Sequence, residues 1–277
     1  MLNRFGGMIR GGPTVSLLRL SGPIGIGGRF RAGLSFETVA PLIDAAFRRR
    51  GVKAVALAIN SPGGSPVQSA LIMKRIRDLA RKHDIPVLAF IEDVAASGGY
   101  MLALAGDEIY AHEASIVGSI GVVAGGFGFP EALSRLGIER RLYMAGEHKA
   151  RLDPFSPERP EDVAWLRSLQ HEVHDWFRDT VIERRGRRLR TDSPGLFSGD
   201  VWLGSRATGI GLIDGIGEMR SVLEKRFGRR FRLLPVTRRK GMLASFLATH
   251  RDAGATNMAE DILAALEARL LWNRFGL

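Results

Sequence analysis

Two glycine-rich turns, each placed directly after a short and wholly apolar run, constrain the fold of this chain most strongly. The run Ala54–Ile59 leads into the turn Asn60–Gly64, and the run Pro86–Ile91 leads into Ala95–Gly99. Apolar runs without alternation suit strands that are buried on both faces. Because a helical pattern follows each turn, the repeated strand–turn–helix unit predicts right-handed crossovers in a parallel sheet. We therefore predict an α/β fold whose two turns share the carboxyl edge of the sheet, where ligands bind.

The flanking elements are predicted from periodicity and capping residues. Residues 14–20 form a first strand, and Ser35 is the N-cap of the helix that follows. The apolar side chains on one face of that helix are Val39, Leu42, Ile43, Ala46 and Phe47. The next helix reaches about Lys82, with Leu71, Ile76 and Leu79 facing inward. A third, apolar helix covers residues 100–105.

The last third of the chain is predicted to be helical. One amphipathic helix covers residues 160–187, a loop follows over 188–199, and a shorter helix covers 217–227. A terminal amphipathic helix has Asn257 as its cap and Glu260 three residues on. Its apolar face consists of Ile262, Leu263, Leu266 and Leu270. We predict one domain over residues 1–235 and a tail over 236–277 whose helix serves docking or oligomerisation.

Composition excludes several classes of protein. The chain has 277 residues and no cysteine, so disulfides, a thiol nucleophile and thiolate metal sites are excluded. The net charge is +11, and only six of the 40 basic residues are lysines. The basic clusters at 48–50, 184–188 and 238–240 lack interleaved aromatic residues, so we expect no nucleic-acid binding. Attraction to an anionic membrane surface stays open.

The sequence contains no segment with the pattern of a membrane span. The longest uncharged stretch, residues 115–130, is interrupted by five glycines, and a span needs about 20 apolar residues. Arg4 and Arg10 are not followed by the apolar region of a secretory signal. We expect a cytoplasmic protein, with peripheral contact at the inner membrane as an open alternative.

Ser97 is the candidate nucleophile. It lies where a buried strand ends and an apolar helix begins, between small neighbours that let a substrate backbone approach. The N–H of Gly98, at the start of the helix, could face a developing oxyanion. The first glycine of G-x-S-x-G is missing, and an ordinary N-cap serine is the structural alternative. Gly63 and Gly64 could supply further N–H donors for the same oxyanion.

The residues alone do not decide which group activates this serine. His148 and Lys149 are adjacent and are both candidates for the base. His83, His112 and His250 are assigned to the surface or to structural roles. The pair His171 and His174 lacks a third ligand, so no metal site is expected.

Four ordered blocks, spread over roughly residues 15–217, resemble the signal peptide peptidase A family of serine proteases (SppA and SohB-like). The blocks are N-S-P-G-G from Asn60, A-S-G-G-Y from Ala96, V-G-S-I-G-V from Val117 and G-E-H-K from Gly146. The resemblance implies the fold of Clp protease and crotonases, a repeated ββα spiral core with C-terminal helices. It also implies a hydrolase that needs no cofactor.

The resemblance assigns a role to each residue of the site. The serine of the second block is the nucleophile, the lysine of the last block is the general base, and the serine of the third block orients that lysine. These positions are Ser97, Lys149 and Ser119. The family's oxyanion hole implies Gly63 and Gly98, and the implied substrate-binding residues are Gly64 and Gly99.

Three expectations about function follow. The chain is a serine endopeptidase with a Ser–Lys dyad that cleaves extended apolar peptides, such as signal-peptide remnants or membrane-protein segments, through an acyl-enzyme. Family members form the dyad between copies, so this single-copy chain is expected to be a homo-oligomer with dyads at subunit interfaces. The alternatives are a crotonase-like acyl-CoA enzyme that uses carboxylates such as Glu92 or Asp93, and a non-catalytic peptide-binding assembly factor.

Overall fold

The structure, a computed structural model, describes residues 12–25, 33–237, 266 and 269–276. Eight strands of this part of the chain form one sheet in the order β6-β5-β3-β2-β1-β8, with β4 paired to β3 and β7 paired to β4. All pairs are parallel except β5 with β6. The strands are β1 (Thr14–Ser21), β2 (Val52–Ser61), β3 (Val87–Ala96), β4 (Glu108–Ala111), β5 (Ile116–Gly118), β6 (Val201–Leu203), β7 (Gly215–Ile216) and β8 (Arg232–Pro235). The predicted α/β class with a parallel sheet is confirmed.

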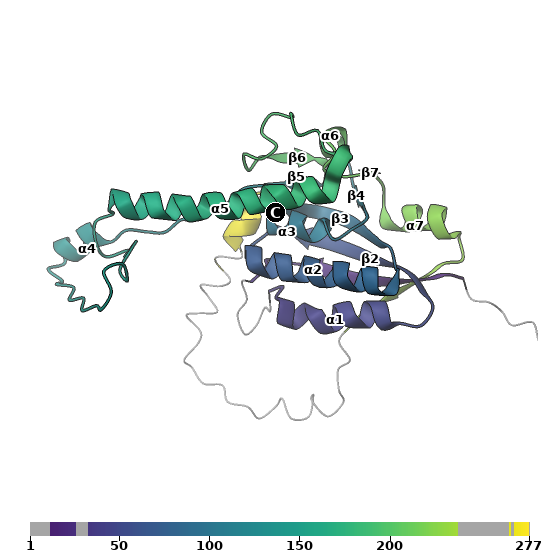
Figure 1. The fold of residues 1–277 in the computed structure, drawn as a ribbon, viewed down its shortest axis with the longest axis horizontal. Helices are drawn as coiled ribbons and strands as arrows, with labels where there is room; N and C mark the ends of the chain where they lie inside the picture. The colour runs from purple at the N-terminus through teal and green to yellow at the C-terminus, as the bar shows by residue number, and fades with distance from the viewer. Residues whose placement is uncertain (1–11, 26–32, 238–265, 267–268, 277) are drawn as a thin grey trace, which may run out of the picture.

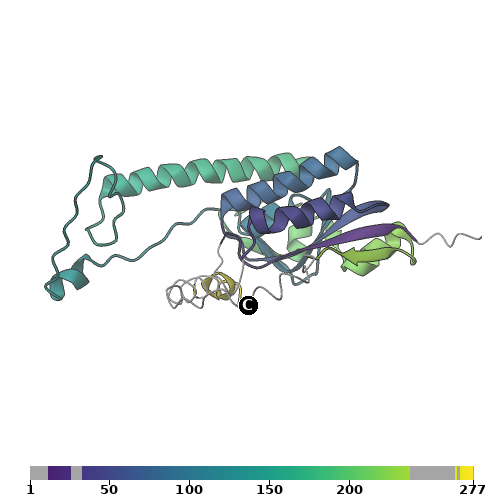
Figure 2. The same ribbon diagram turned by 90° about the horizontal axis from the view of Figure 1, so that it is seen from below.

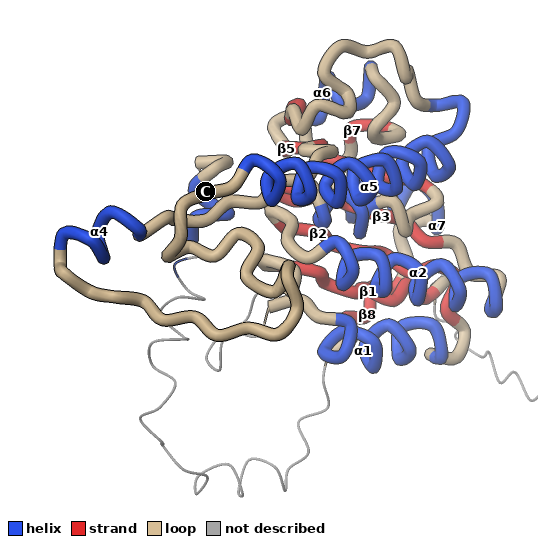
Figure 3. The backbone as a smooth tube through the Cα atoms, turned by 60° about the vertical axis from the view of Figure 1, so that its left-hand side comes forward, coloured by secondary structure: helices blue, strands red, loops and turns tan. Residues whose placement is uncertain are grey.

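Helices cover both faces of this sheet (Figure 1). They are α1 (Phe36–Arg48), α2 (Pro66–His83), α3 (Gly98–Ala103), α4 (Pro130–Arg135), α5 (Pro160–Arg185), the 3₁₀ turn η1 (Gly186–Arg188), α6 (Gly204–Gly209) and α7 (Met219–Phe227). The main core packs α1, α2, α3 and α5 against one face, and Figure 3 shows α1, α2 and α5 aligned there. On the other face Leu223 of α7 packs against Ala54 and Ala56.

A capping residue starts α1 where the sequence predicts. The Ser35 side chain accepts a hydrogen bond from the N–H of Thr38, and the Thr38 hydroxyl accepts one from the N–H of Ser35. This reciprocal pair forms the predicted cap of α1. In α2 the predicted orientation of Leu71 is wrong, because its side chain is 40% exposed and Ile72 is fully buried instead. The buried face of α2 follows the spacing of Ser69, Ile72, Ile76 and Leu79, one position away from Leu71.

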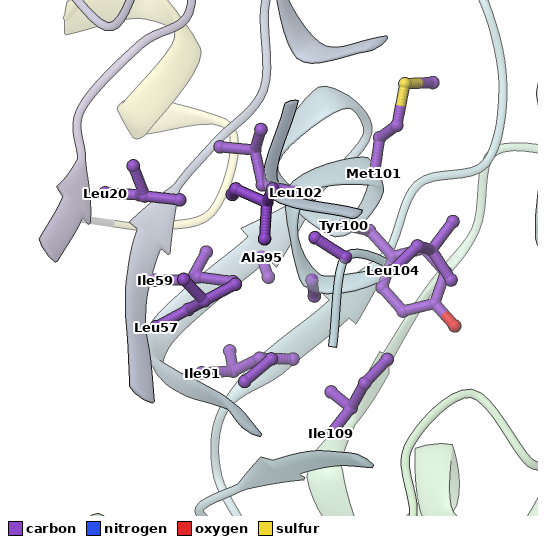
Figure 4. Packing of buried hydrophobic residues seen from close by; sticks show 14 of the residues in the cluster. Leu20, Leu57, Ile59, Ile91, Ala95, Tyr100, Met101, Leu102, Leu104 and Ile109 are labelled. Atoms are coloured by element: carbon purple, nitrogen blue, oxygen red, sulfur yellow. The ribbon is translucent and has the colours of Figure 1, made fainter. Parts of the chain in front are cut away.

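Strand β3 is longer than the predicted run and serves two parts of the sheet. Its first half, up to Ile91, pairs with β2 and β4, and its last three residues pair with β5. Helix α3 follows directly and is wholly buried. Figure 4 shows Leu102 beside Ala95, which is near the end of β3, and Leu104 beside Tyr100. The residue between β3 and α3 is therefore fixed from both sides.

Residues 123–159, here called the arm, project beyond the sheet. They contain α4 and long irregular segments, and with the first turns of α5 they form the far end of the molecule (Figures 1 and 2). The last described strand, β8, ends at Pro235, and the boundary between a domain over 1–235 and a tail over 236–277 stays a prediction. Most of the predicted terminal helix lies outside the described residues, and Leu266 and Leu270 within it are exposed.

Candidate active site

Ser97 occupies a strained turn between β3 and α3. Its φ is 53° and its ψ is −122°, a conformation that costs a non-glycine residue about 1–3 kcal/mol. Two backbone bonds hold it: its N–H donates to the carbonyl of Gly118 at 2.7 Å, and its own carbonyl accepts from Met101 at 3.1 Å. Its side chain makes no capping hydrogen bond. The alternative of an ordinary N-cap serine therefore lacks the hydrogen bond from a helix N–H to the serine hydroxyl that defines it. The Ser97 hydroxyl is not used in capping α3.

Three chain segments meet around this serine because glycines allow them to. A Cβ on Gly63 would lie 2.9 Å from the Cβ of Ser97. A Cβ on Gly98 would lie 2.5 Å from Ser69 Oγ, and one on Gly99 would lie 2.3 Å from the carbonyl oxygen of Ser61. The Asn60–Gly64 turn and the Ala95–Gly99 turn are thus in direct contact, as the shared sheet edge predicted.

The N–H groups near Ser97 differ in their bonding. The N–H of Gly63 points toward Ser61 Oγ, at 3.3 Å. The N–H groups of Gly64 and Gly98 have no hydrogen-bond acceptor among the described residues. Gly64 and Gly98 also line the same pocket as Ser97. Gly64, which the sequence assigned to substrate binding, is therefore as well placed as Gly63 to donate to an oxyanion.

A small apolar pocket, open to solvent, adjoins Ser97. Its walls come from the two glycine turns, the start of α2, α3, the segment after β5, and α5. The lining residues are Gly64, Pro66, Ser97, Gly98, Met101, Gly121, Val122, Val173, Trp176 and Phe177. Val173, Trp176 and Phe177 belong to α5, a contribution that the sequence did not indicate. None of these lining residues is titratable, so the described residues of this chain place no candidate base in the pocket.

Ser119 lies in a second strained turn next to Ser97. Its φ is 52° and it is 7% exposed. Its N–H donates to the carbonyl of Asp200 at 2.7 Å. Gly118, the residue before it, accepts the Ser97 N–H, and a Cβ there would lie 2.7 Å from the Trp202 ring. Strand β6 therefore fixes both serine turns through one glycine.

Lys149 and its rival His148 lie elsewhere. Both are exposed and belong to the arm, which extends away from α3 in Figures 1 and 2. The Lys149 N–H donates to the carbonyl of Gly146 at 3.2 Å. The chain thus brings together Ser97, Ser119 and the four glycines and leaves the lysine apart.

Ion pairs and hydrogen bonds give the arm a defined shape at its junction with α5. Asp162 is 2% exposed and pairs with Arg159 at 2.8 Å and with Arg151 at 3.2 Å. The Arg151 guanidinium also lies 5.0 Å from the centre of the Trp165 ring. Inside the arm, the Ser156 hydroxyl lowers the pKa of Asp153. The exposed apolar side chains of the arm include Phe127, at 83%, and Tyr143, at 89%.

The carboxylates of the crotonase alternative are engaged elsewhere. Glu92 forms an ion pair with Arg19 at 2.6 Å, and Asp93 accepts from the amide of Asn60 at 2.6 Å. Neither residue lines the pocket. These contacts count against a role for either carboxylate beside Ser97.

The histidines show no metal site within the described residues. His83 stacks on Phe47 with ring centroids 6.4 Å apart, and His112 Nδ1 accepts from Ala114 at 3.1 Å. His171 is exposed, and Nε2 of His174 is buried without a hydrogen-bond partner. His250 lies outside the described residues.

Comparison with known proteins decides the family. The model of peptidase family S49 matches residues 79–226, which include both serine turns, the arm and α5. The chain belongs to peptidase family S49. This confirms the predicted family, and with it the Clp protease/crotonase-like fold.

Several relatives of this S49 chain are peptidases by name. It is 32% identical to the putative signal peptide peptidase SppA of Enterococcus faecium over 63% of this chain and 50% of that one. It is 34% identical to protease 4 of Haemophilus influenzae over 68% of this chain and 30% of that one. It is also 48% identical, over 95% of its length, to a Brucella abortus protein named Na(+)/H(+) antiporter NhaA, of which it spans 37%. The chain therefore spans well under two thirds of each of these relatives.

No described helix is both long enough and apolar enough to cross a bilayer.

Proposed function

We propose that this chain is a serine endopeptidase whose nucleophile is Ser97 and whose general base is Lys149 of a neighbouring copy. The observation that carries the proposal is the strained Ser97 turn, which lies beside unbonded N–H groups and an apolar pocket. Family S49 membership supports the peptidase chemistry. The exposed position of Lys149 on the projecting arm supports its delivery to another copy.

The reaction divides into two steps. In the first, the Lys149 amine takes the Ser97 proton as Oγ attacks the peptide carbonyl, and the N–H of Gly98 with those of the Gly63-Gly64 turn holds the oxyanion. The same proton then goes to the departing amine, which leaves an acyl-enzyme. In the second step a water molecule, deprotonated by the lysine, hydrolyses the ester.

A lysine acts as a base only when its amine is held uncharged, and a dry site favours that state. In one copy Lys149 is exposed to water, whereas the pocket beside Ser97 is apolar. Placing the lysine of one copy over the pocket of the next would exclude water from it. The hydroxyl of Ser119, fixed by β6 beside the Ser97 turn, would then orient the amine.

The pocket supports an apolar substrate side chain. Met101, Val122 and Phe177 line it without any charged group. We propose that the substrates are extended apolar peptides, such as signal-peptide remnants or segments of membrane proteins. The name of the Enterococcus relative, a signal peptide peptidase, favours substrates of this kind. For substrates of this kind we propose a peripheral location at the cytoplasmic side of the inner membrane.

A fluorophosphonate probe tests the nucleophile. The probe should label the wild-type chain and leave Ser97→Ala unlabelled, while Ser168→Ala, an exposed serine of α5, retains labelling. Equal labelling of wild type and Ser97→Ala would remove Ser97 from the mechanism. Absence of labelling in wild-type oligomers would favour a binding protein without catalysis.

A further inference from the structure

Two short segments concentrate the positive charge of the chain. Residues 48–53 and 225–232 together contain nine basic side chains and no acidic one. The arm, by contrast, contains six basic and five acidic side chains. The net charge of +11 is therefore distributed unevenly over the molecule.

The fold brings these two segments side by side. Thr14, at the start of β1, pairs with Val52 on one side and with Arg232 on the other. The Arg49 guanidinium, at the end of α1, donates to the carbonyl of Leu234 in β8 at 3.1 Å. We call the surface formed by residues 48–53 and 225–232 the basic edge. It lies at the amino ends of the parallel strands, on the right-hand side of Figure 1.

Most of this charge has no structural function in the described part of the chain. Arg48 pairs with Asp44, Arg226 pairs with Glu108, and Arg49 bonds to backbone carbonyls. The other six side chains are exposed and have no carboxylate partner among the described residues: Arg50, Lys53, Lys225, Arg229, Arg230 and Arg232. Favourable interaction with a helix dipole accounts only for Lys225, because the other five lie outside helices. The acidic residues toward the same end of the molecule include Asp84, which is exposed at the end of α2, and Asp107, Glu108 and Glu224, which are partly exposed and pair with Arg77, Arg226 and Arg220.

The aromatic residues in these segments favour a lipid surface over a nucleic acid. Phe227 and Phe231 pack beside Leu223 in the second core cluster, so they are not available to stack on bases. A bilayer needs only a set of accessible cations and no matched groove. We propose that the basic edge docks this protein on an anionic lipid bilayer.

This orientation leaves the candidate active site free. Ser97 follows the carboxyl end of β3, whereas the basic edge lies at the amino ends of the strands. A chain docked through the basic edge therefore presents its pocket and its arm away from the lipid headgroups. The proposal gives a surface to the peripheral membrane contact proposed above. It rests on charge placement and not on the peptidase mechanism.

Vesicle flotation with the full chain tests the proposal. The wild type should bind vesicles that contain about 30% phosphatidylglycerol and should not bind vesicles of pure phosphatidylcholine. It should dissociate from the anionic vesicles at about 0.5 M salt. The triple variant Arg50→Glu, Arg229→Glu, Arg230→Glu should bind the anionic vesicles at least about a hundredfold more weakly. Its circular dichroism and its fluorophosphonate labelling should match the wild type, which separates a docking failure from a failure of the proposed chemistry.

A control variant with the same change in net charge is Arg167→Glu, Arg190→Glu, Arg206→Glu. These exposed arginines lie outside the basic edge, and the control should bind vesicles within about twofold of wild type. The proposal would be overturned if the two triple variants lost vesicle binding equally, or if the basic-edge variant kept it. It would also be overturned if the wild type did not bind anionic vesicles. Binding to duplex DNA through the basic edge without vesicle binding would also overturn it.

Discussion

The turn around Ser97 and the arm that carries Lys149 are built by opposite means. The turn is enclosed: α3 is wholly buried, glycines on three segments leave no space for a Cβ, and two backbone bonds hold a strained serine. The arm is open, and side chains such as Tyr143 and Phe127 are more than 80% exposed. One chain thus encloses the proposed nucleophile together with the proposed oxyanion donors, whereas the proposed base lies on an arm for which the described residues show no hydrogen bond or ion pair to that turn.

Substitutions of the two serines test the enclosed turns, and the loss of Ser97 is expected to lower activity most. Ser97→Ala should lower kcat/KM for an apolar peptide by at least about a thousandfold, because no other hydroxyl occupies the strained turn. Ser119→Ala should lower kcat/KM less, by about ten- to a hundredfold, since the lysine would lose only the hydroxyl that orients its amine. Steady-state kinetics on both variants measures the ratio. Equal losses would contradict the separate roles proposed for the two serines.

Gly64→Ala should lower kcat/KM by about a hundredfold or more. Its φ is +137°, and an added Cβ would lie 2.1 Å from the carbonyl oxygen of Ile24, so the N–H that lines the pocket would have to move. Gly125→Ala in the arm is the matched control, because a Cβ there meets nothing within 4 Å. Kinetics together with the thermal midpoint distinguishes loss of the donor from loss of the fold. Full activity in Gly64→Ala would exclude the Gly64 N–H from the oxyanion hole.

The pH dependence of unfolding can be compared between Asp214, directly before β7, and Asp153 in the arm. Burial alone would raise the pKa of Asp214, but the bonds from Arg185 lower it overall. Arg185 is 2% exposed, so Asp214→Asn should cost about 3 kcal/mol of unfolding free energy at neutral pH by leaving that charge unpaired.

The direction of the pH dependence follows from the lowered pKa. A carboxylate with a folded-state pKa below its unfolded value stabilises the fold above the unfolded value and loses that effect as pH falls through the folded value. Wild type should therefore lose this stability below about pH 4, and Asp214→Asn should show less of that loss. Asp153→Asn in the exposed arm should shift the chemical-denaturation midpoint much less. A larger effect from Asp153 than from Asp214 would reverse the comparison.

The smallest predicted effect on activity concerns the apolar surface of the arm. Phe127→Ser with Tyr143→Ser should weaken assembly and lower activity about tenfold at a fixed protein concentration, while each chain stays folded. Leu71→Ser, an exposed leucine on α2, should leave both unchanged. Sedimentation velocity and activity measured over a concentration series check the outcome. Retained assembly in the double variant would show that these arm residues are not at the interface.

The enclosed half of the site could be predicted because its signals are local. The apolar runs, the glycine turns and the Ser35 cap each lie within a few residues of the structure they form. Leu71 was placed wrongly because neighbouring leucine and isoleucine both fit an inward position until the phase of the helix is known. The short strands β4 to β7 have two to four residues, and their partners are far along the chain, so no local pattern marks them.

The wall of the pocket and the base could not be derived in the same way. Val173 and Phe177 reach Ser97 only through the packing of α5 over α3, which depends on the whole fold. Lys149 follows from the resemblance of its block to a family motif, and its position in the arm explains why local reasoning could not choose it over His148. A residue that acts on another copy has no partner in its own chain for a sequence pattern to indicate.

Mixing two inactive variants tests the central claim most directly. Ser97→Ala and Lys149→Ala should each be inactive alone. After subunit exchange, a mixed oligomer should regain up to about a quarter of wild-type activity, because some interfaces then join an intact serine to an intact lysine from another copy. The fluorophosphonate should then label only the Lys149→Ala copies. Mixtures that exchange subunits and yet remain inactive would contradict a dyad shared between copies.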